Sequence, residues 1–66
     1  MEKLTEQAQV LEAAIRSEDD YELMIRCAND EDESGMIYVG TRLGVTINAD
    51  DAWSLIDVYQ TRGSAY

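Results

Sequence analysis

The sequence divides at Asn29-Asp30-Glu31-Asp32-Glu33-Ser34-Gly35, where four consecutive carboxylates lie between two apolar runs. Ser34 and Gly35 have the side chains that favour turns, through local hydrogen bonding and backbone freedom respectively. The same run is the densest charge in a chain whose net charge is −9. The stretch therefore predicts a charged connection between two regular elements.

The apolar runs on either side of this connection have the composition of strands. The two alternating phases of residues 21–28 are Tyr21, Leu23, Ile25 and Cys27, and Glu22, Met24, Arg26 and Ala28. A period of two is typical of a strand with one buried face, and residues 36–39 are rich in strand-favouring types. Residues 40–44 fit a tight turn into a third strand, Val45-Thr46-Ile47, or a glycine bulge in one bent strand. The sequence thus predicts a hairpin or small sheet over about residues 20–47.

Helices are predicted at both ends of the chain. Residues 2–17 repeat apolar side chains at the spacing of one helical face, and residues 49–62 do so again. Asn48 is a good N-cap for the second helix, and Asp51 can complete its capping box. The expected fold class is α+β, in one small domain over residues 1–66. Its order is α-β-β-(β)-α, with two layers and both helices on one face of a small antiparallel sheet.

The charge balance points to a basic partner. Fourteen acidic residues face five basic ones, so direct binding to nucleic acid is not expected, because that affinity comes from basic groups that neutralise phosphates. An acidic surface instead attracts basic proteins and accelerates encounter with them. A core of this size rarely supplies more than about 3–5 kcal/mol, which also favours association, with another protein or as a homodimer.

Catalysis, metals and cofactors are not expected. The chain has no histidine and a single cysteine, Cys27, which excludes an intrachain disulfide and a structural zinc site. Cys27 is predicted to be a buried thiol, since no histidine can act as its base. A lone cysteine favours a reducing compartment. With neither a signal-peptide pattern nor an apolar run of membrane-span length, the expected location is the cytoplasm.

Two acidic clusters are the candidate partner-binding site. Its eight predicted residues are Glu18, Asp19, Asp20, Glu22, Asp30, Glu31, Asp32 and Glu33. In an extended chain, acidic residues lie about 3.4 Å apart, which matches the axial spacing of phosphates along one DNA strand. Such a run on a sheet edge would present a DNA-like charge density. A solvated turn without a partner is the plain alternative.

Two other interpretations use overlapping residues. Asp30 to Gly35 fits the first half of an EF-hand calcium loop, but the twelfth position is Thr41 rather than glutamate, and the predicted flanks are strands. Alternatively, the chain is a small structural or regulatory interaction protein whose apolar sheet face makes the contact. In that case Met24, Arg26 and Tyr38 matter, a homodimer is one outcome, and the acidity serves solubility alone.

The whole profile resembles small acidic anti-defence proteins encoded by phages and mobile elements, among them anti-CRISPR proteins and other DNA mimics. The resemblance covers the overall composition and the clusters at residues 18–22 and 30–33. It rests on no diagnostic motif and transfers no individual residue. It implies a non-enzymatic inhibitor that occupies the basic groove of a nucleic-acid-binding protein in the cytoplasm of the host cell.

Overall fold

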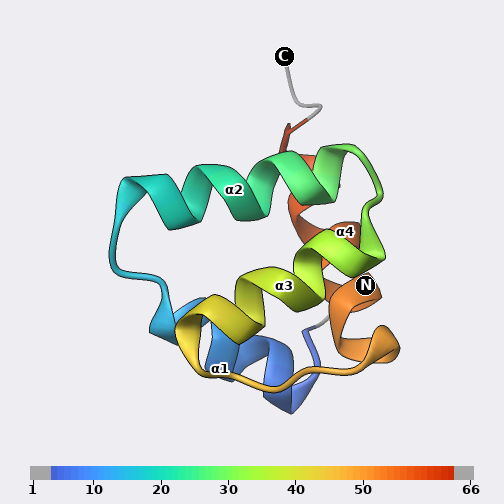
Figure 1. Cartoon of the computed structure of the whole chain (residues 1–66). Coiled ribbons are helices and arrows are strands. Elements are labelled where there is room, and N and C mark those ends of the chain that lie inside the picture. The colour runs from blue at the N-terminus through green and yellow to red at the C-terminus, as the bar shows by residue number, and fades with distance from the viewer. Residues whose placement is uncertain (1–3, 64–66) are drawn as a thin grey trace.

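The computed structural model describes residues 4–63, with side chains through Gln60. All regular secondary structure in this part of the chain is α-helical (Figure 1). The helices are α1 (Glu6–Ala14), α2 (Glu18–Asn29), α3 (Glu33–Leu43) and α4 (Ala49–Gly63). No strand occurs among these residues. The predicted α+β class, with its two-layer α-β-β-(β)-α sheet, is therefore wrong, and the fold is all-α.

The segment predicted as the first strand forms α2 because its burial follows a helical period. Met24, Cys27 and Ala28 are buried, and positions i, i+3 and i+4 share one face of a helix. Ser17 begins the helix as its N-cap, where its side chain accepts a hydrogen bond from the Asp20 backbone N–H at 3.2 Å. The acidic residues 18–20 then suit the positive end of the helix dipole.

The segment predicted as the second strand forms α3 for the same reason. Met36, Val39 and Gly40 are buried with the i, i+3, i+4 spacing. Asp32 caps the helix start, where its carboxylate accepts from the Gly35 N–H at 2.9 Å. Gly44 ends the helix at φ 77°, the left-handed conformation in which glycine is favoured.

The predicted third strand is a connecting segment without strand pairing. Val45 and Ile47 are buried while Thr46 between them is exposed. Both buried residues pack into the core between helices instead of on a sheet. The Gln7 side chain of α1 donates to the Thr46 carbonyl at 2.9 Å, and Figure 1 shows this segment running beside α1.

Helices at both ends of the chain are confirmed, with different bounds for the first. α1 is shorter than the predicted 2–17, because Thr5 caps its start and Ile15 is extended. Residues 2 and 3 lie outside the described residues. α4 begins at the predicted capping box: the Asp51 N–H donates to Asn48 Oδ1 at 2.9 Å, and the Asn48 N–H donates to Asp51 Oδ2 at 3.1 Å.

α4 is the central packing element, since its contacts with the other three helices are the most extensive. The largest fully buried side chains come from all four helices, and they are Leu11, Met24, Met36, Val39, Leu55 and Ile56. Burial of one such side chain stabilises the fold by roughly 1.5–3 kcal/mol. This arrangement places α2 with its inner face on α4 and α3, and leaves its outer face to solvent.

Candidate functional site

The structure places the eight predicted residues at the two ends of α2. The first group, at the amino-terminal end, contains Glu18, Asp19, Asp20 and Glu22, and the second, around the turn into α3, contains Asp30, Glu31, Asp32 and Glu33. The two groups are therefore separated by the length of α2, about 18 Å for its twelve residues. They do not form the continuous edge expected from a sheet.

In the first group, Asp20 differs from its neighbours because it is bound within the protein. Its Oδ1 lies 3.3 Å from Arg42 Nη2 of α3, and its Oδ2 accepts from the Ser17 hydroxyl at 3.1 Å. Glu18, Asp19 and Glu22 are exposed, and none of their side chains bonds to another described residue. Asp20 therefore ties α2 to α3, while the other three carboxylates face solvent.

The second group divides in the same way. Asp32 caps α3, and Glu33 accepts a hydrogen bond from the Trp53 indole N–H of α4 at 2.8 Å. Asp30 and Glu31 are exposed, and within the described part of the chain their side chains have no bonding partner. We call the solvent-facing carboxylates of both groups the contact set; its members are Glu18, Asp19, Glu22, Asp30 and Glu31.

The backbone of Glu31 has the left-handed conformation, which is unfavourable for a residue with a side chain. Among the described residues, Glu31 is the non-glycine residue with a positive φ, at 54°. A Cβ atom in this conformation destabilises the folded state by about 1–2 kcal/mol. We therefore expect Glu31→Gly to raise the free energy of unfolding by about 0.5–1 kcal/mol, after the larger entropy of unfolded glycine is subtracted. Urea unfolding measures this change.

Glu31→Gln is the matched control, since it removes the same charge but keeps the strained side chain. Equal stability of the two variants would show that relief of backbone strain at residue 31 does not explain the gain.

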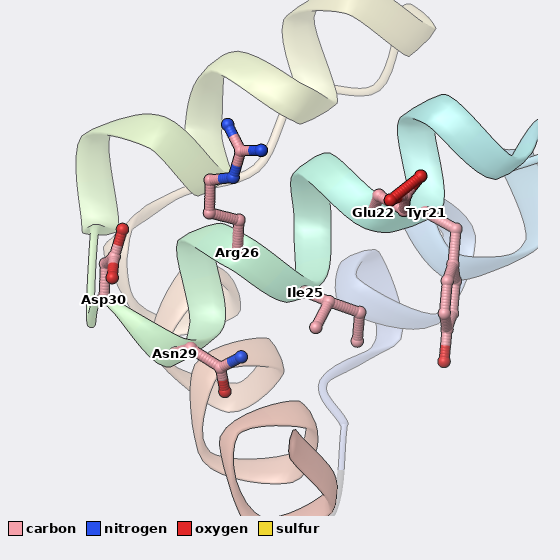
Figure 2. A pocket seen from close by; sticks show the side chains of 6 residues that line it. All are labelled: Tyr21, Glu22, Ile25, Arg26, Asn29 and Asp30. Atoms are coloured by element: carbon pink, nitrogen blue, oxygen red, sulfur yellow. The ribbon is translucent and has the colours of Figure 1, made fainter. Parts of the chain in front are cut away.

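The outer face of α2 between the two groups is grooved. An open groove of about 450 Å³ is lined by Tyr21, Glu22, Ile25, Arg26, Asn29 and Asp30 (Figure 2). A second groove of about 360 Å³ lies on the side of α3, and Glu22 and Arg26 line it too. Figure 2 shows the Arg26 side chain directed toward α3 and Tyr21 directed to the other side of α2. Glu22 and Arg26 thus form a charged ridge between the two grooves.

The sequence reasoning missed the apolar part of this surface. Tyr21 and Ile25 were predicted on the same strand face as the buried Cys27, yet Tyr21 is 45% exposed. Their spacing of four residues places both on one side of a helix, so the signal was present once α2 is recognised as helical. The Ser17-Asp20 cap is the sequence feature that identifies it.

The alternative sheet-face surface is wrong, because no sheet is present in residues 4–63 and its members separate. Met24 is fully buried in the core, whereas Tyr38 is 55% exposed on α3. Arg26 lies on the exposed side of α2. Asp51, near the start of α4, is buried and accepts a hydrogen bond from the Thr5 hydroxyl at 2.6 Å, so its carboxylate is used within the protein.

The acidic run has the helical flanks of an EF-hand, but the segment between the helices is too short for a calcium loop. α2 and α3 flank the acidic run, so the predicted strand flanks are wrong, yet α3 already begins at Glu33. An EF-hand loop needs twelve residues to wrap around the ion. Among the described residues, no three acidic or cysteine side chains gather in a way that could hold a metal ion.

Cys27 is buried, as predicted. Burial raises the pKa of its thiol, and the nearby carboxylates of Asp32 and Asp30 raise it further, against a smaller opposite effect of Arg26. The native state therefore holds the thiol proton more tightly than the unfolded state. Because the unfolded thiol ionises first, stability is complete below its ordinary pKa of 9.0 and falls above it.

We expect Cys27→Ala to remove this part of the alkaline loss of stability. Urea unfolding of both proteins between neutral pH and a pH above 9.0, the ordinary thiol value, measures it. Parallel pH profiles would show that Cys27 titrates alike in the folded and unfolded states.

Comparisons with known protein families, curated proteins and solved structures find no match for this chain. Of the helices between residues 4 and 63, none combines the length and the apolar character required to cross a bilayer.

Proposed function

We propose that this chain is a non-enzymatic inhibitor or modulator that binds a basic surface of a nucleic-acid-binding protein, in the manner of a DNA mimic. One observation carries the proposal: residues 18–33 contain eight acidic residues and one arginine. This segment has a net charge of −7 within a chain total of −9. The negative charge is thus concentrated on α2 and its following turn.

The carboxylates of this segment can be compared with the phosphates of one DNA strand. α2 extends over about 18 Å, and one strand of B-DNA carries about five phosphates over that length at 3.4 Å each. Within α2 itself, four acidic residues and one arginine give a net charge of −3, and Asp30 to Glu33 add four carboxylates beyond its end. The expectation of evenly spaced carboxylates along an extended edge is therefore replaced by two groups separated by a helix.

The environment of the carboxylates also supports a role in binding. Five of the eight are exposed and make no bond to a described residue. A glycine would stabilise position 31, yet the sequence places a charged side chain there. Both features are understandable if these charges act on a partner, since they contribute little to the packing of this fold.

An interaction protein that relies on apolar contact alone is the less favoured function. The exposed large apolar side chains are Val10, Tyr21, Tyr38 and Trp53. Each of them lies on a different helix, and at most a few neighbouring residues of the same helix join any one of them. The acidic residues, by contrast, concentrate on one segment.

Affinity capture from a host-cell lysate, eluted stepwise with salt, tests the proposal. We place the encounter in the cytoplasm, where such machinery works, and expect a basic nucleic-acid-binding protein to elute as the salt rises from about 0.05 to about 0.5 M, an interval that shortens the Debye length about threefold. A partner that stays bound across this range, or one without affinity for nucleic acid, would contradict the proposal.

A further inference from the structure

We infer that the groove on the α4 side of α2 binds a short amphipathic helix of the partner, with basic side chains at both of its ends and apolar side chains between them. This inference rests on the proposed function and specifies the partner segment. Helices that lie in apolar grooves are a common mode of protein recognition, and their anchors are spaced by three or four residues.

Two of the residues that line the groove are apolar, and one of them is held in place. Tyr21 and Ile25 lie one helical turn apart on α2. The Tyr21 ring packs edge-on against Tyr59 of α4, with 6.3 Å between the ring centroids and an interplanar angle of 86°. Tyr59 is itself buried and donates its phenolic hydroxyl to Glu12 of α1. An exposed tyrosine that is fixed in this way loses little entropy on binding.

The charges around the groove define what can occupy it. Glu18 and Glu22 lie toward one end of α2, Asp30 and Glu31 lie at the other, and Arg26 lies between them. A complementary segment carries basic side chains about 18 Å apart, a separation set by the length of α2. An acidic side chain opposite Arg26 completes the match. Such an alternation distinguishes the segment from a uniformly basic one.

The same charges disfavour a second copy of this chain as the occupant. Two α2 helices packed face to face would oppose acidic ends in either orientation, because both ends are acidic. Like charges brought together across an interface cost several kcal/mol. The groove therefore fits a partner of opposite charge.

Synthetic peptides test the inference against the full chain by fluorescence anisotropy. The first peptide has lysines at both ends of a helix-forming sequence, two leucines one turn apart and a central glutamate. The second replaces the leucines by serine and keeps every charge. We expect the first to bind about tenfold more tightly, a difference typical of one anchor residue.

Tyr21→Ser and Tyr38→Ser form a matched pair of variants, because both tyrosines are exposed and only Tyr21 lines the groove. We expect Tyr21→Ser to remove the tenfold preference for the first peptide and Tyr38→Ser to keep it, with unchanged far-ultraviolet circular dichroism in both. A Tyr21→Ser loss that Tyr38→Ser reproduces would overturn the inference.

Equal binding of the two peptides would also overturn the inference while leaving the proposed function intact, provided that both peptides are released by salt. Binding of both that is insensitive to salt would contradict the proposed function itself. Sedimentation velocity of the chain alone measures whether it forms a dimer. A dimer that dissociates in Tyr21→Ser would assign the groove to a second copy and overturn the inference.

Discussion

Neutralising the contact set is expected to weaken the complex with the basic partner about a hundredfold. The variant carries Glu18→Gln, Asp19→Asn, Glu22→Gln, Asp30→Asn and Glu31→Gln. Exposed ion pairs contribute about 0.2–1 kcal/mol each, so five of them supply about 2–3 kcal/mol, and each 1.4 kcal/mol corresponds to about tenfold in affinity. Isothermal titration calorimetry with the captured partner measures the loss.

The fold of this variant should persist, because Asp20, Asp32 and Glu33, which bond within the protein, are left unchanged. Loss of Glu18 and Asp19 from the first turn of α2 costs about 0.3–1 kcal/mol each, and loss of Asp30 at the opposite end of the dipole offsets part of it. Circular dichroism confirms the helix content before binding is compared.

Glu6→Gln with Asp50→Asn is the control for charge alone. Both carboxylates are exposed, they lie on α1 and α4, and neither lines the groove of α2. If binding depends on the α2 surface, this variant loses much less affinity per removed charge than the contact-set variant. An equal loss per charge would show that net charge, wherever it lies, accounts for the affinity.

Gly40→Ala is expected to lower the free energy of unfolding by about 1–2 kcal/mol, a large share of what a domain of this size has. A Cβ at residue 40 would lie 2.6 Å from the Val45 carbonyl oxygen and 3.2 Å from Leu11 Cδ1. The Val45 N–H also donates to the Gly40 carbonyl at 2.8 Å, so the connecting segment is held against the helix at this point. Overpacking of this kind typically costs about 1–3 kcal/mol.

The sign of the change in the free energy of unfolding distinguishes a crowded site from an open one. Alanine is a better helix former than glycine by about 1 kcal/mol, so a site that could accept the methyl group would be stabilised. Gly44→Ala is the comparison, since a Cβ there meets open space and only its φ of 77° opposes the change. Urea unfolding of the two variants measures both effects, and a Gly40→Ala protein more stable than the natural one would contradict the packing described for α3.

The terminal helices could be predicted because each has a local signal that tertiary packing does not reverse. Asn48 and Asp51 form the capping box that their spacing indicates, and Leu11 lies on the predicted apolar face of α1. These elements depend on caps and on a periodicity that extends over several turns. Residues close in sequence carry both kinds of information.

The central segment could not be assigned from the same periodicity. Eight residues with apolar side chains at 21, 23, 25 and 27 fit a strand, but burial of Met24, Cys27 and Ala28 is decided by contact with α3 and α4. The capping residues Ser17 and Asp32 were the discriminating signals. Short apolar runs are ambiguous between strand and helix, and such caps separate the two.

The acidic residues of the candidate site could be named from the sequence, but their arrangement could not. Their number and position follow from the sequence alone. Whether they form one edge or two groups depends on the conformation of α2, and so does the exposure of Tyr21 beside them. The error in the fold therefore changed the geometry of the predicted site and hid its apolar groove.

Competition with DNA tests the central claim most directly. The captured partner is bound to labelled duplex DNA, and the natural chain or its contact-set variant is then added while DNA release is followed by anisotropy. We predict that the natural chain displaces the DNA completely at saturation and that the variant needs about a hundredfold more protein, in line with its lost ion pairs. A ternary complex of partner, DNA and this chain would contradict the claim that α2 occupies the nucleic-acid-binding surface.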